Sequence, residues 1–562
     1  MRHVLVLVAA LLLVPSALAL SCGSSITNDT FLTDDIMGCP ATGIYIGASG
    51  VTLDCQGHRI DGVDASGSAG VWVQGASGIT VRDCVITDFE NGIYLQDGPA
   101  YAGGLIEGNI ISSVVTGIKQ RFYRGVRIHD NTIGNLSYCG IELAFSSGEN
   151  DISANTFTNT HTPIYGFGSS GENNVTDNRA RKSTYGIHFY SGSGYNIIER
   201  NIVADSKYAG LTLESSPVIT DHNVVRNNTF SNAQVGVKLM TSHDNIIEGN
   251  TMLHTGNGLL MYHNDWGGGD ALRNIVSSNL IVGSSIGIQV ANGFNNTFAG
   301  NTVTTGSPIR VSKCGNTFIA NIGPGGLPLL YAEQAVFMSG GAFSQVVLCD
   351  ADGSVIENMS IGPGTSGLYA LYLDDAVIRG VHSSGNSYGA YFRNSSNITI
   401  ADSVFMSNAY EGVLLSGVRA SVVAGNTFVN NTMAIELASS VGNILWGNDV
   451  RGTTFYLAYE DEDSNGNAWD LGDIGNYWED FVTNPGYPLT YIVPGPGDGV
   501  DYRPLNDRDG DGYPSWNDCD DQSGAINPGA AEKCNQVDDD CDGLVDELYC
   551  LPFKPRPKFT QA

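Results

Sequence analysis

The sequence predicts an all-β solenoid in which short parallel strands wind around a common axis. Asparagine recurs in phrases such as Glu-Gly-Asn-Thr, mostly at steps of 20 to 29 residues, and each is followed by a Gly-Ile-x-Leu phrase or a close variant. A repeat this short cannot bury its own apolar face, so it must stack on its neighbours. The recurring residues are Asn109, Asn131, Asn155, Asn178, Asn201, Asn228, Asn250, Asn279, Asn301, Asn321, Asn426 and Asn448.

The Gly-Ile phrases predict strands and not helices. Apolar and polar residues alternate with period two over four to six residues, between Gly, Asn and Ser, whereas helical periodicity is nearly absent. Strands that follow one another in the same sense fit three short parallel sheets. We therefore expect parallel pairing between residues 92–95 and 117–119, and hydrogen bonds between stacked asparagine amides along the axis.

These phrases resemble the right-handed parallel β-helix superfamily, and in particular the NosD-like proteins with carbohydrate-binding and sugar-hydrolase-type coils. The resemblance covers roughly residues 43 to 505. A segment from Gly466-Asn467-Ala468-Trp469 to Asp501-Tyr502-Arg503-Pro504-Leu505 resembles the closing segment of the NosD-like group. The fold does not imply one chemistry, because enzymes and inert rods share it. Few Met and His residues and no cluster of soft ligands are present, so copper is not expected.

Several segments follow from these patterns. Residues 1–19 combine a basic start, an apolar run and a small-x-small site, which predicts a signal peptide and an exported protein, secreted or on the cell surface; a lipid anchor at Cys22 is the alternative. No later stretch is long and apolar enough to span a membrane. The remaining segments are an N-terminal cap (20–42), the β-helix (43–505, with a weaker repeat at 322–366 and a closing cap at 456–505), an acidic calcium-binding module (506–551) and a tail (552–562).

Charge and cysteine content narrow the possible partners. A net charge of −31 excludes simple nucleic-acid binding, which needs a basic surface. Eleven cysteines in an exported chain predict disulfides. Cys22 and Cys39 are placed to staple the N-terminal entry, while Cys55 and Cys84 lie in adjacent coils, either paired or buried as thiols. The sequence indicates no partners for Cys139, Cys314 and Cys349.

The sharpest chemical pattern lies in the acidic module. Carboxylates at loop positions 1, 3, 5 and 12, with Gly at 6 and a backbone carbonyl at 7, have the spacing of a calcium loop. The first loop is formed by Asp507, Asp509, Asp511, Tyr513 and Asp518, and a second, incomplete one by Asp538, Asp540, Asp542 and Asp546.

The module also resembles thrombospondin type 3 repeats and MopE-type metal-binding modules, which implies Ca²⁺ and disulfides as its main supports. A solvated acidic tail is the simpler alternative. Zinc is less favoured because Cys519, Cys534, Cys541 and Cys550 include no Cys-x-x-Cys pair.

On the β-helix, the residue after each Gly-Ile should point outward and stack in register from coil to coil. Tyr and Trp have flat apolar faces with polar edges that suit sugar rings, so this column predicts binding of a polysaccharide or cell-surface glycan. Decoration of an exposed sheet is the alternative. The column comprises Tyr45, Trp72, Tyr94, Lys119, Glu142, Tyr165 and His188.

An enzymatic interpretation stays open because basic residues concentrate beside tyrosines in the same coils. Arg121 could neutralise a uronate carboxylate while Tyr165 or His188 moves a proton, as a polysaccharide lyase, hydrolase or epimerase requires. A structural envelope or adhesion element is the third possibility.

Overall fold

In a computed structural model of the chain, the structure describes residues 20–262, 269–472, 474–487, 489–505, 513, 518–520 and 523–545. The predicted signal peptide and the tail at 552–562 lie outside these residues. The chain divides into an N-terminal unit, residues 1–301, and a C-terminal unit, residues 302–562. Each unit is described by itself.

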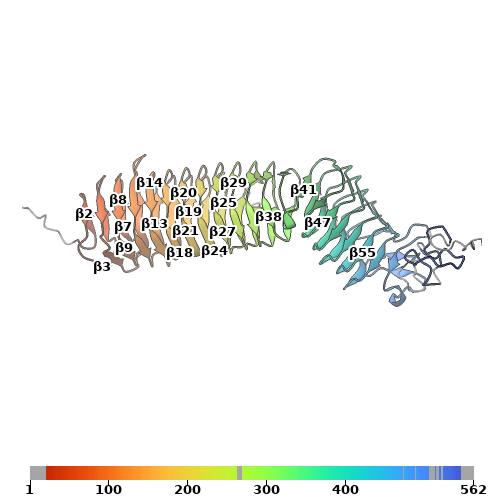
Figure 1. The fold of residues 1–562 in the computed structure, drawn as a ribbon. Helices are drawn as coiled ribbons and strands as arrows, with labels where there is room; N and C mark the ends of the chain where they lie inside the picture. The colour runs from red at the N-terminus through yellow and green to blue at the C-terminus, as the bar shows by residue number, and fades with distance from the viewer. Residues whose placement is uncertain are drawn as a thin grey trace, which may run out of the picture. The chain divides into compact units, whose positions relative to one another are not determined.

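The N-terminal unit is a parallel β-helix in which each turn gives one strand to each of three sheets. In Figure 1 these strands stand side by side along one axis. The second sheet runs from β2 (Thr30–Phe31) to β37 (Thr297–Ala299) and the third from β3 (Ile36–Cys39) to β34 (Leu280–Val282). The first sheet contains β1 (Ser24–Ile26), β4 (Ile44–Ile46), β7 (Ala69–Gln74), β10 (Asn91–Gln96), β13 (Thr116–Arg121), β16 (Cys139–Ala144), β19 (Thr162–Phe167), β22 (Ile187–Tyr190), β25 (Ala209–Glu214), β28 (Val235–Met240), β31 (Asn257–Tyr262) and β35 (Ile286–Val290).

The pairing between successive turns is parallel, as predicted. β10 pairs with β13 so that Ile93 lies opposite Ile118 and Tyr94 opposite Lys119. Residues 20–42 contribute β1 to β3, which pair in the same way with the next turn. The strand ladder therefore starts before residue 43.

The glycine of each Gly-Ile phrase is required by close approach to the next turn. A Cβ placed on Gly92 would lie 2.5 Å from the carbonyl oxygen of Gly117 and 2.6 Å from Cγ2 of Ile111. Gly117 meets its own next turn in the same way, 2.5 Å from the carbonyl oxygen of Gly140. Gly therefore leaves room for the adjacent coil, while the following Ile fills the core, where Ile93 and Ile118 are fully buried.

Buried asparagines form continuous ladders along the axis, as predicted. In the N-terminal unit, the side-chain Nδ2 of each asparagine donates to Oδ1 of the next at 2.9 to 3.0 Å, through nine residues from Asn109 to Asn301. A second ladder, not anticipated, runs from Asn150 to Asn296. Such satisfied networks let polar side chains occupy a buried turn.

The C-terminal unit contains a second set of three parallel sheets. The second sheet runs from β42 (Phe337–Ser339) to β57 (Ile444–Trp446) and the third from β43 (Ala342–Phe343) to β60 (Tyr477–Trp478). Its first sheet contains β41 (Leu329–Ala332), β44 (Gln345–Cys349), β47 (Ser366–Leu371), β50 (Tyr388–Arg393), β53 (Glu411–Ser416), β56 (Met433–Ala438) and β59 (Tyr456–Glu460). Among the described residues, helix is limited to the 3₁₀ turns η1 (Pro324–Gly326) and η2 (Phe481–Thr483).

In the segment predicted to close the β-helix, two buried tryptophans each donate a hydrogen bond to a carboxylate. Trp469 donates from Nε1 to Glu460 at 3.0 Å, and Trp478 donates to Asp501 at 2.9 Å. Burial raises the pKa of Asp501 to about 6, against hydrogen bonds that lower it. An antiparallel pair, β61 (Tyr491–Ile492) and β62 (Val500–Asp501), completes the segment.

Disulfides fasten both units. Cys22 pairs with Cys39, the predicted staple, and Cys55 pairs with Cys84, which resolves the choice between pairing and burial. Cys314 pairs with Cys349 across 35 residues, a link that the sequence did not indicate, and Cys139 is a buried thiol.

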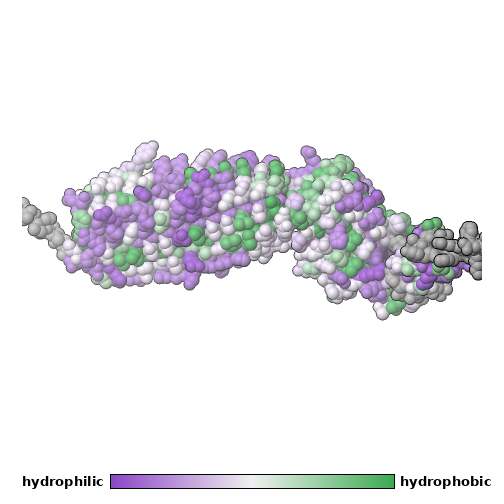
Figure 2. Space-filling view, in the orientation of Figure 1, coloured by the Kyte–Doolittle hydropathy of each residue, from purple (hydrophilic) through white to green (hydrophobic). Residues whose placement is uncertain are grey.

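The surface of the described residues is mixed in character. Figure 2 shows a largely hydrophilic face with scattered hydrophobic patches in each unit. Within the described ranges, no helix has the length and apolar character needed to cross a bilayer.

Candidate functional site

The predicted outward column lies in register on the first sheet of the N-terminal unit. Tyr45 is opposite Trp72, Trp72 is opposite Tyr94, and the pairing continues through Lys119 to His188. The ring centroids of Tyr45 and Trp72 are 6.0 Å apart, and those of Trp72 and Tyr94 are 5.2 Å apart. These rings therefore pack on one another, and their edges, more than their faces, meet solvent.

Tyr45 differs from the other rings because its preceding neighbour is Ser25, a small residue. It is 37% exposed. Trp72 is half-buried, and its indole N–H lies buried without a hydrogen-bond partner. The N-terminal end of the column thus offers one accessible ring, followed by rings that are part of the packing.

The middle of the column is an ion pair and not an open contact surface. Lys119 Nζ lies 3.6 Å from Glu142 Oε2, and Glu142 is only 5% exposed. Burial raises the pKa of Glu142, while Lys119 lowers it. Glu142 is therefore largely buried between its register neighbours Lys119 and Tyr165, and its contact with a substrate stays a prediction.

Tyr165 and His188 come together at the end of the column. Their ring centroids are 5.3 Å apart, and His188 Nε2 lies 3.2 Å from Glu214 Oε2. Burial raises the pKa of Tyr165 well above its usual range, so its phenol is a hydrogen-bond donor at neutral pH and not a base. The His188 and Glu214 pair is the one suited to accept a proton.

A second aromatic column flanks Tyr165 and His188. Its members are successive contacts on adjacent turns, with ring centroids 5.1 to 6.1 Å apart, and the ring of Tyr185 also lies 5.8 Å from that of His188. Together with Tyr165 and His188 they form what we call the aromatic cluster. The second column comprises Tyr138, His161, Tyr185 and Tyr208.

Sequence reasoning missed this second column and Glu214. The available signal was an aromatic residue or histidine one or two positions before the Gly, or before Pro163, in consecutive phrases.

Arg121 lies apart from the aromatic cluster. Its register partner is Ala144, which is opposite Phe167 on the next turn, so it belongs to the neighbouring outward position. Its guanidinium carbon lies 5.4 Å from the ring centroid of Phe122 and 5.6 Å from that of Phe145. The structure thus brings together two of the three catalytic candidates and leaves the cation on other aromatic rings.

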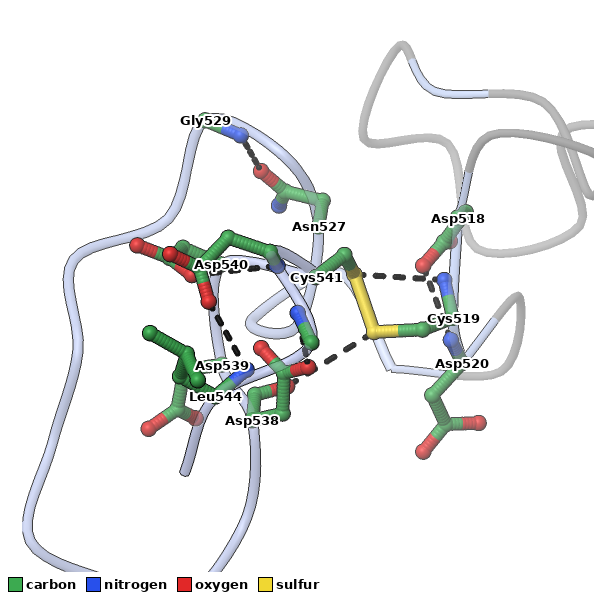
Figure 3. The surroundings of a disulfide bond; sticks show 12 residues. Asp518, Cys519, Asp520, Asn527, Gly529, Asp538, Asp539, Asp540, Cys541 and Leu544 are labelled. Atoms are coloured by element: carbon green, nitrogen blue, oxygen red, sulfur yellow. Dashed lines mark hydrogen bonds between the residues drawn. A yellow bond between two sulfur atoms is a disulfide. The ribbon is translucent and has the colours of Figure 1, made fainter. Parts of the chain in front are cut away.

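The acidic module holds a group of carboxylates around a disulfide. Figure 3 shows Asp518, Asp538 and Asp540 near the Cys519–Cys541 bond. That bond contradicts a zinc site using these sulfurs, because disulfide sulfur is not a thiolate ligand. Ligand atoms of Glu532, Asp538 and Asp540 all lie within 4.8 Å of one another.

The second predicted loop shows features of a cation-binding turn. Gly543 N–H donates to Asp538 Oδ2 at 2.9 Å, which closes the loop from position 6 to position 1. Asp538 Oδ1 is buried without a partner, as is Oδ2 of Asp518. Burial raises the pKa of Asp540, and the neighbouring carboxylates add to the rise.

The remaining predicted ligands have different fates. Asp542 accepts a hydrogen bond from Leu544 N–H at 2.8 Å and lies outside the three-carboxylate group, whereas Glu532 is a member that sequence reasoning missed. Of the first loop, Tyr513 and Asp518 are described. The other predicted ligands lie outside the described residues: Asp507, Asp509, Asp511 and Asp546.

Comparison with protein families agrees with this organisation. The model for the right handed beta helix region matches residues 42–201 and 164–322, which together make up half of the chain. The model for the periplasmic copper-binding protein NosD matches residues 344–483, and the MopE metal-binding motif matches residues 518–547. The disulfides and the periplasmic family indicate an extracytoplasmic protein.

Solved structures with similar strand arrangements include enzymes acting on carbohydrates. The mannuronan C-5 epimerase AlgE6 A-module of Azotobacter vinelandii is 14% identical, covering 53% of this chain and 91% of its own, with a TM-score of 0.40. The GH87 α-1,3-glucanase catalytic domain is 14% identical, covering 54% and 64%, with a TM-score of 0.39. DFA-IIIase of Arthrobacter chlorophenolicus A6 is 14% identical, covering 45% and 81%, with a TM-score of 0.34. These values concern the fold alone, and no curated protein matches the chain.

The residues of the two metal-associated segments do not suit copper. Copper in proteins prefers imidazole, thiolate and thioether ligands. Among the described residues of 344–483, no group of three His, Cys, Asp or Glu ligand atoms lies within 4.8 Å. In the module one three-residue group consists of carboxylates, and the other, Asp518 with Cys519 and Cys541, has both sulfurs in a disulfide. Unpartnered carboxylate oxygens suit a hard cation instead.

Proposed function

Because the chain belongs to the right-handed beta-helix family, we propose that it is a secreted or cell-surface protein whose first sheet binds carbohydrate or another surface polymer. The aromatic cluster is the observation that carries this function. Side-by-side columns of tyrosine and histidine on adjacent turns present ring edges, hydroxyls and imidazoles at intervals of about 4.8 Å. A glycan lying along the axis meets both apolar and hydrogen-bonding groups there.

A glycan array of the mature protein tests this proposal. Binding should weaken at least tenfold in Tyr165→Ala and Tyr185→Ala. Tyr195→Ala is the matched control, because Tyr195 is also an exposed ring stacked on a histidine, His222, but lies outside the cluster. A protein that binds no glycan would favour the structural envelope or adhesion role.

An enzyme acting on acidic glycans is the second candidate, supported by the 3.2 Å contact between His188 and Glu214 beside the protonated Tyr165. In that case His188→Ala and Tyr165→Phe should abolish turnover of a uronate polymer, as a lyase, hydrolase or epimerase would show. Product analysis by mass spectrometry and NMR distinguishes the three reactions. If the protein binds the polymer but releases no product, the enzymatic candidate is excluded and only the binding function is supported.

We further propose that the acidic module takes up Ca²⁺, with Glu532, Asp538 and Asp540 as ligands in the second loop. Asp507, Asp509, Asp511, Asp518 and the Tyr513 carbonyl are the proposed ligands of the first loop. Three clustered carboxylates repel one another unless a cation lies among them. The ion supplies charge neutralisation and cross-linking of this module.

Calorimetry of the oxidised full chain with CaCl₂ tests the second loop. Asp538→Asn and Glu532→Gln should remove one binding event, whereas Asp352→Asn, a carboxylate in the β-helix, should not. If the module is equally resistant to protease in Ca²⁺ and in chelator and shows no heat of binding, it is a solvated acidic tail and not a calcium site.

A further inference from the structure

A cavity of about 400 Å³ opens on the first sheet of the C-terminal unit. One wall is β39 (Ser307–Val311) with Ser312, and the others are the outward side chains of β47, β50 and β53 together with Tyr410. The residues that matter for the argument are Arg310, Tyr369, Tyr388, Tyr391, Arg393 and Tyr410. None of them belongs to the aromatic cluster of the N-terminal unit.

Hydrogen bonds hold the wall segment in place. The Gln345 side chain, 2% exposed, accepts from Ile309 N–H at 3.0 Å and donates to the Ile309 carbonyl at 2.9 Å. Tyr369 hydroxyl donates to the Val311 carbonyl at 3.3 Å, and Thr365 hydroxyl donates to the Gly306 carbonyl at 2.8 Å. The cavity is therefore a built feature and not a gap between loose loops.

The two arginines in this cavity have no acidic partner. Neither Arg310 nor Arg393 forms an ion pair with a carboxylate of the described residues, although the chain carries a net charge of −31. By contrast, exposed arginines such as Arg200 and Arg273 pair with aspartates at 2.9 and 2.6 Å. Burial raises the pKa of Tyr369, and the guanidinium groups of Arg393 and Arg310 oppose that rise, so both cations act on one phenol.

A pair of carboxyl groups lies at the edge of the same tyrosines. Glu411 is 9% exposed, and its Oε2 is buried without a hydrogen-bond partner. Burial and the neighbouring Glu436 raise the pKa of Glu411 to about 7, because two carboxylates this close share one proton. Glu411 begins β53, which pairs with β50, and Glu436 lies opposite Leu414 of the cavity lining.

We propose that this cavity binds an acidic sugar residue, with its anionic group on Arg310 and Arg393 and its ring against Tyr388, Tyr391 and Tyr410. Guanidinium groups match the geometry of carboxylates and sulfate esters, and tyrosine suits the mixed polar and apolar surface of a pyranose. The inference stands apart from the glycan function proposed for the N-terminal unit, because no residue is shared.

Titration calorimetry of the full chain with two charged probes tests the cavity. Trigalacturonic acid carries carboxylates, and a sulfated trisaccharide carries sulfate esters, so the tighter probe identifies the preferred anion. The methyl ester of trigalacturonic acid is the neutral control. We expect the charged probe to bind at least tenfold more tightly than the ester, and Arg393→Gln and Arg310→Gln each to weaken it at least tenfold.

Matched variants separate this site from the rest of the surface. Arg379→Gln removes an exposed arginine of β48 (Val377–Arg379) that pairs with Asp402, and it should leave affinity unchanged. Tyr195→Ala, at an exposed ring outside both sites, should also leave it unchanged. If an arginine variant misfolds, Tyr391→Phe is the substitute: it keeps the aromatic ring but removes the hydroxyl, and it should bind the charged probe more weakly. Absence of binding by both charged probes, equal affinity for the ester, or equal loss in Arg379→Gln would overturn the proposal.

Discussion

The first sheets of the two units are built from the same strand pattern but present different surfaces. In the N-terminal unit, Tyr45, Trp72 and Tyr94 follow one another on adjacent turns, and their rings pack against one another. In the C-terminal unit, the rings of Tyr369 and Tyr391 on adjacent turns are tilted at 56° to each other, and β39 contributes the other wall of a cavity. The same repeat thus yields a self-packed ribbon in one unit and a hollow in the other.

The difference shows how a solenoid acquires a site. In strict register each outward side chain is partly covered by its equivalents on the adjacent turns, as Glu142 is by Lys119 and Tyr165. Polar groups then find partners within the column. Where a strand of a different sheet, β39, contributes a wall, Arg310 and Arg393 have no carboxylate partner among the described residues and a ligand can reach them.

The largest expected difference between the units is in their asparagine ladders. Asn178 makes five side-chain hydrogen bonds, to both adjacent turns, whereas Asn426 makes three, because Ser403 replaces an asparagine on the preceding turn. Asn178→Ala should lower the free energy of unfolding by about 3 kcal/mol and Asn426→Ala by about 2 kcal/mol. Hydrogen exchange measured separately on peptides from each unit provides the check. If Asn178→Ala and Asn426→Ala lowered stability equally, the two additional hydrogen bonds of Asn178 would contribute nothing.

The second prediction concerns pH and the C-terminal unit. Its Glu411 has a folded pKa of about 7, above the ordinary 4.5, so its contribution to stability is complete below pH 4.5 and is lost as pH rises through 7. The unit should therefore be about 2 kcal/mol less stable at pH 8.5 than at pH 5.5. The other ionisable side chains near the pair are Tyr388, Tyr391, Tyr410 and Asp461.

Glu411→Gln isolates this effect. Asp501 shifts in the same direction, so the informative quantity is the difference in pH dependence between wild type and variant. The variant should show a flatter profile of melting temperature against pH. Parallel profiles would mean that the two carboxyl groups do not share a proton.

The sequence was sufficient for the fold because its signals are local and repeated. Gly92 and Gly117 mark close approaches between turns, and each asparagine of the ladder marks a buried corner. The outward register followed from strand alternation alone. Exposure did not follow, because the size of neighbours on adjacent turns decides whether a residue such as Glu142 reaches solvent.

The cavity could not be predicted, because its lining combines strands of two different sheets. Arg310 of β39 lines the cavity with Arg393 of β50, 83 positions later in the chain. Cys314 and Cys349 are a similar case, since their pairing depends on how the irregular stretch between two ladders folds. Glu532 was missed because it precedes the acidic loop that it joins.

The third prediction tests whether the aromatic column is packing or binding surface. Trp72 lies between two rings, so Trp72→Ala should reduce stability by about 1–2 kcal/mol besides any effect on glycan binding. Thermal melting followed by far-ultraviolet dichroism gives the measurement. An unchanged melting temperature with weaker binding would instead make this ring an accessible contact residue.

The smallest effects on stability are expected for two partly exposed rings, one in the N-terminal column and one at the C-terminal cavity. Tyr45 is 37% exposed at the start of the N-terminal column, and Tyr410 is 54% exposed at the edge of the C-terminal cavity. Replacing either with Ala should change the free energy of unfolding by no more than about 1 kcal/mol, because each ring is partly exposed and contacts rings on one side only. Binding should respond differently: Tyr410→Ala should weaken an acidic trisaccharide about threefold, while Tyr45→Ala leaves that affinity unchanged. If Tyr45→Ala weakened the same probe, the two surfaces would have to share one ligand, and their separation into ribbon and cavity would fail.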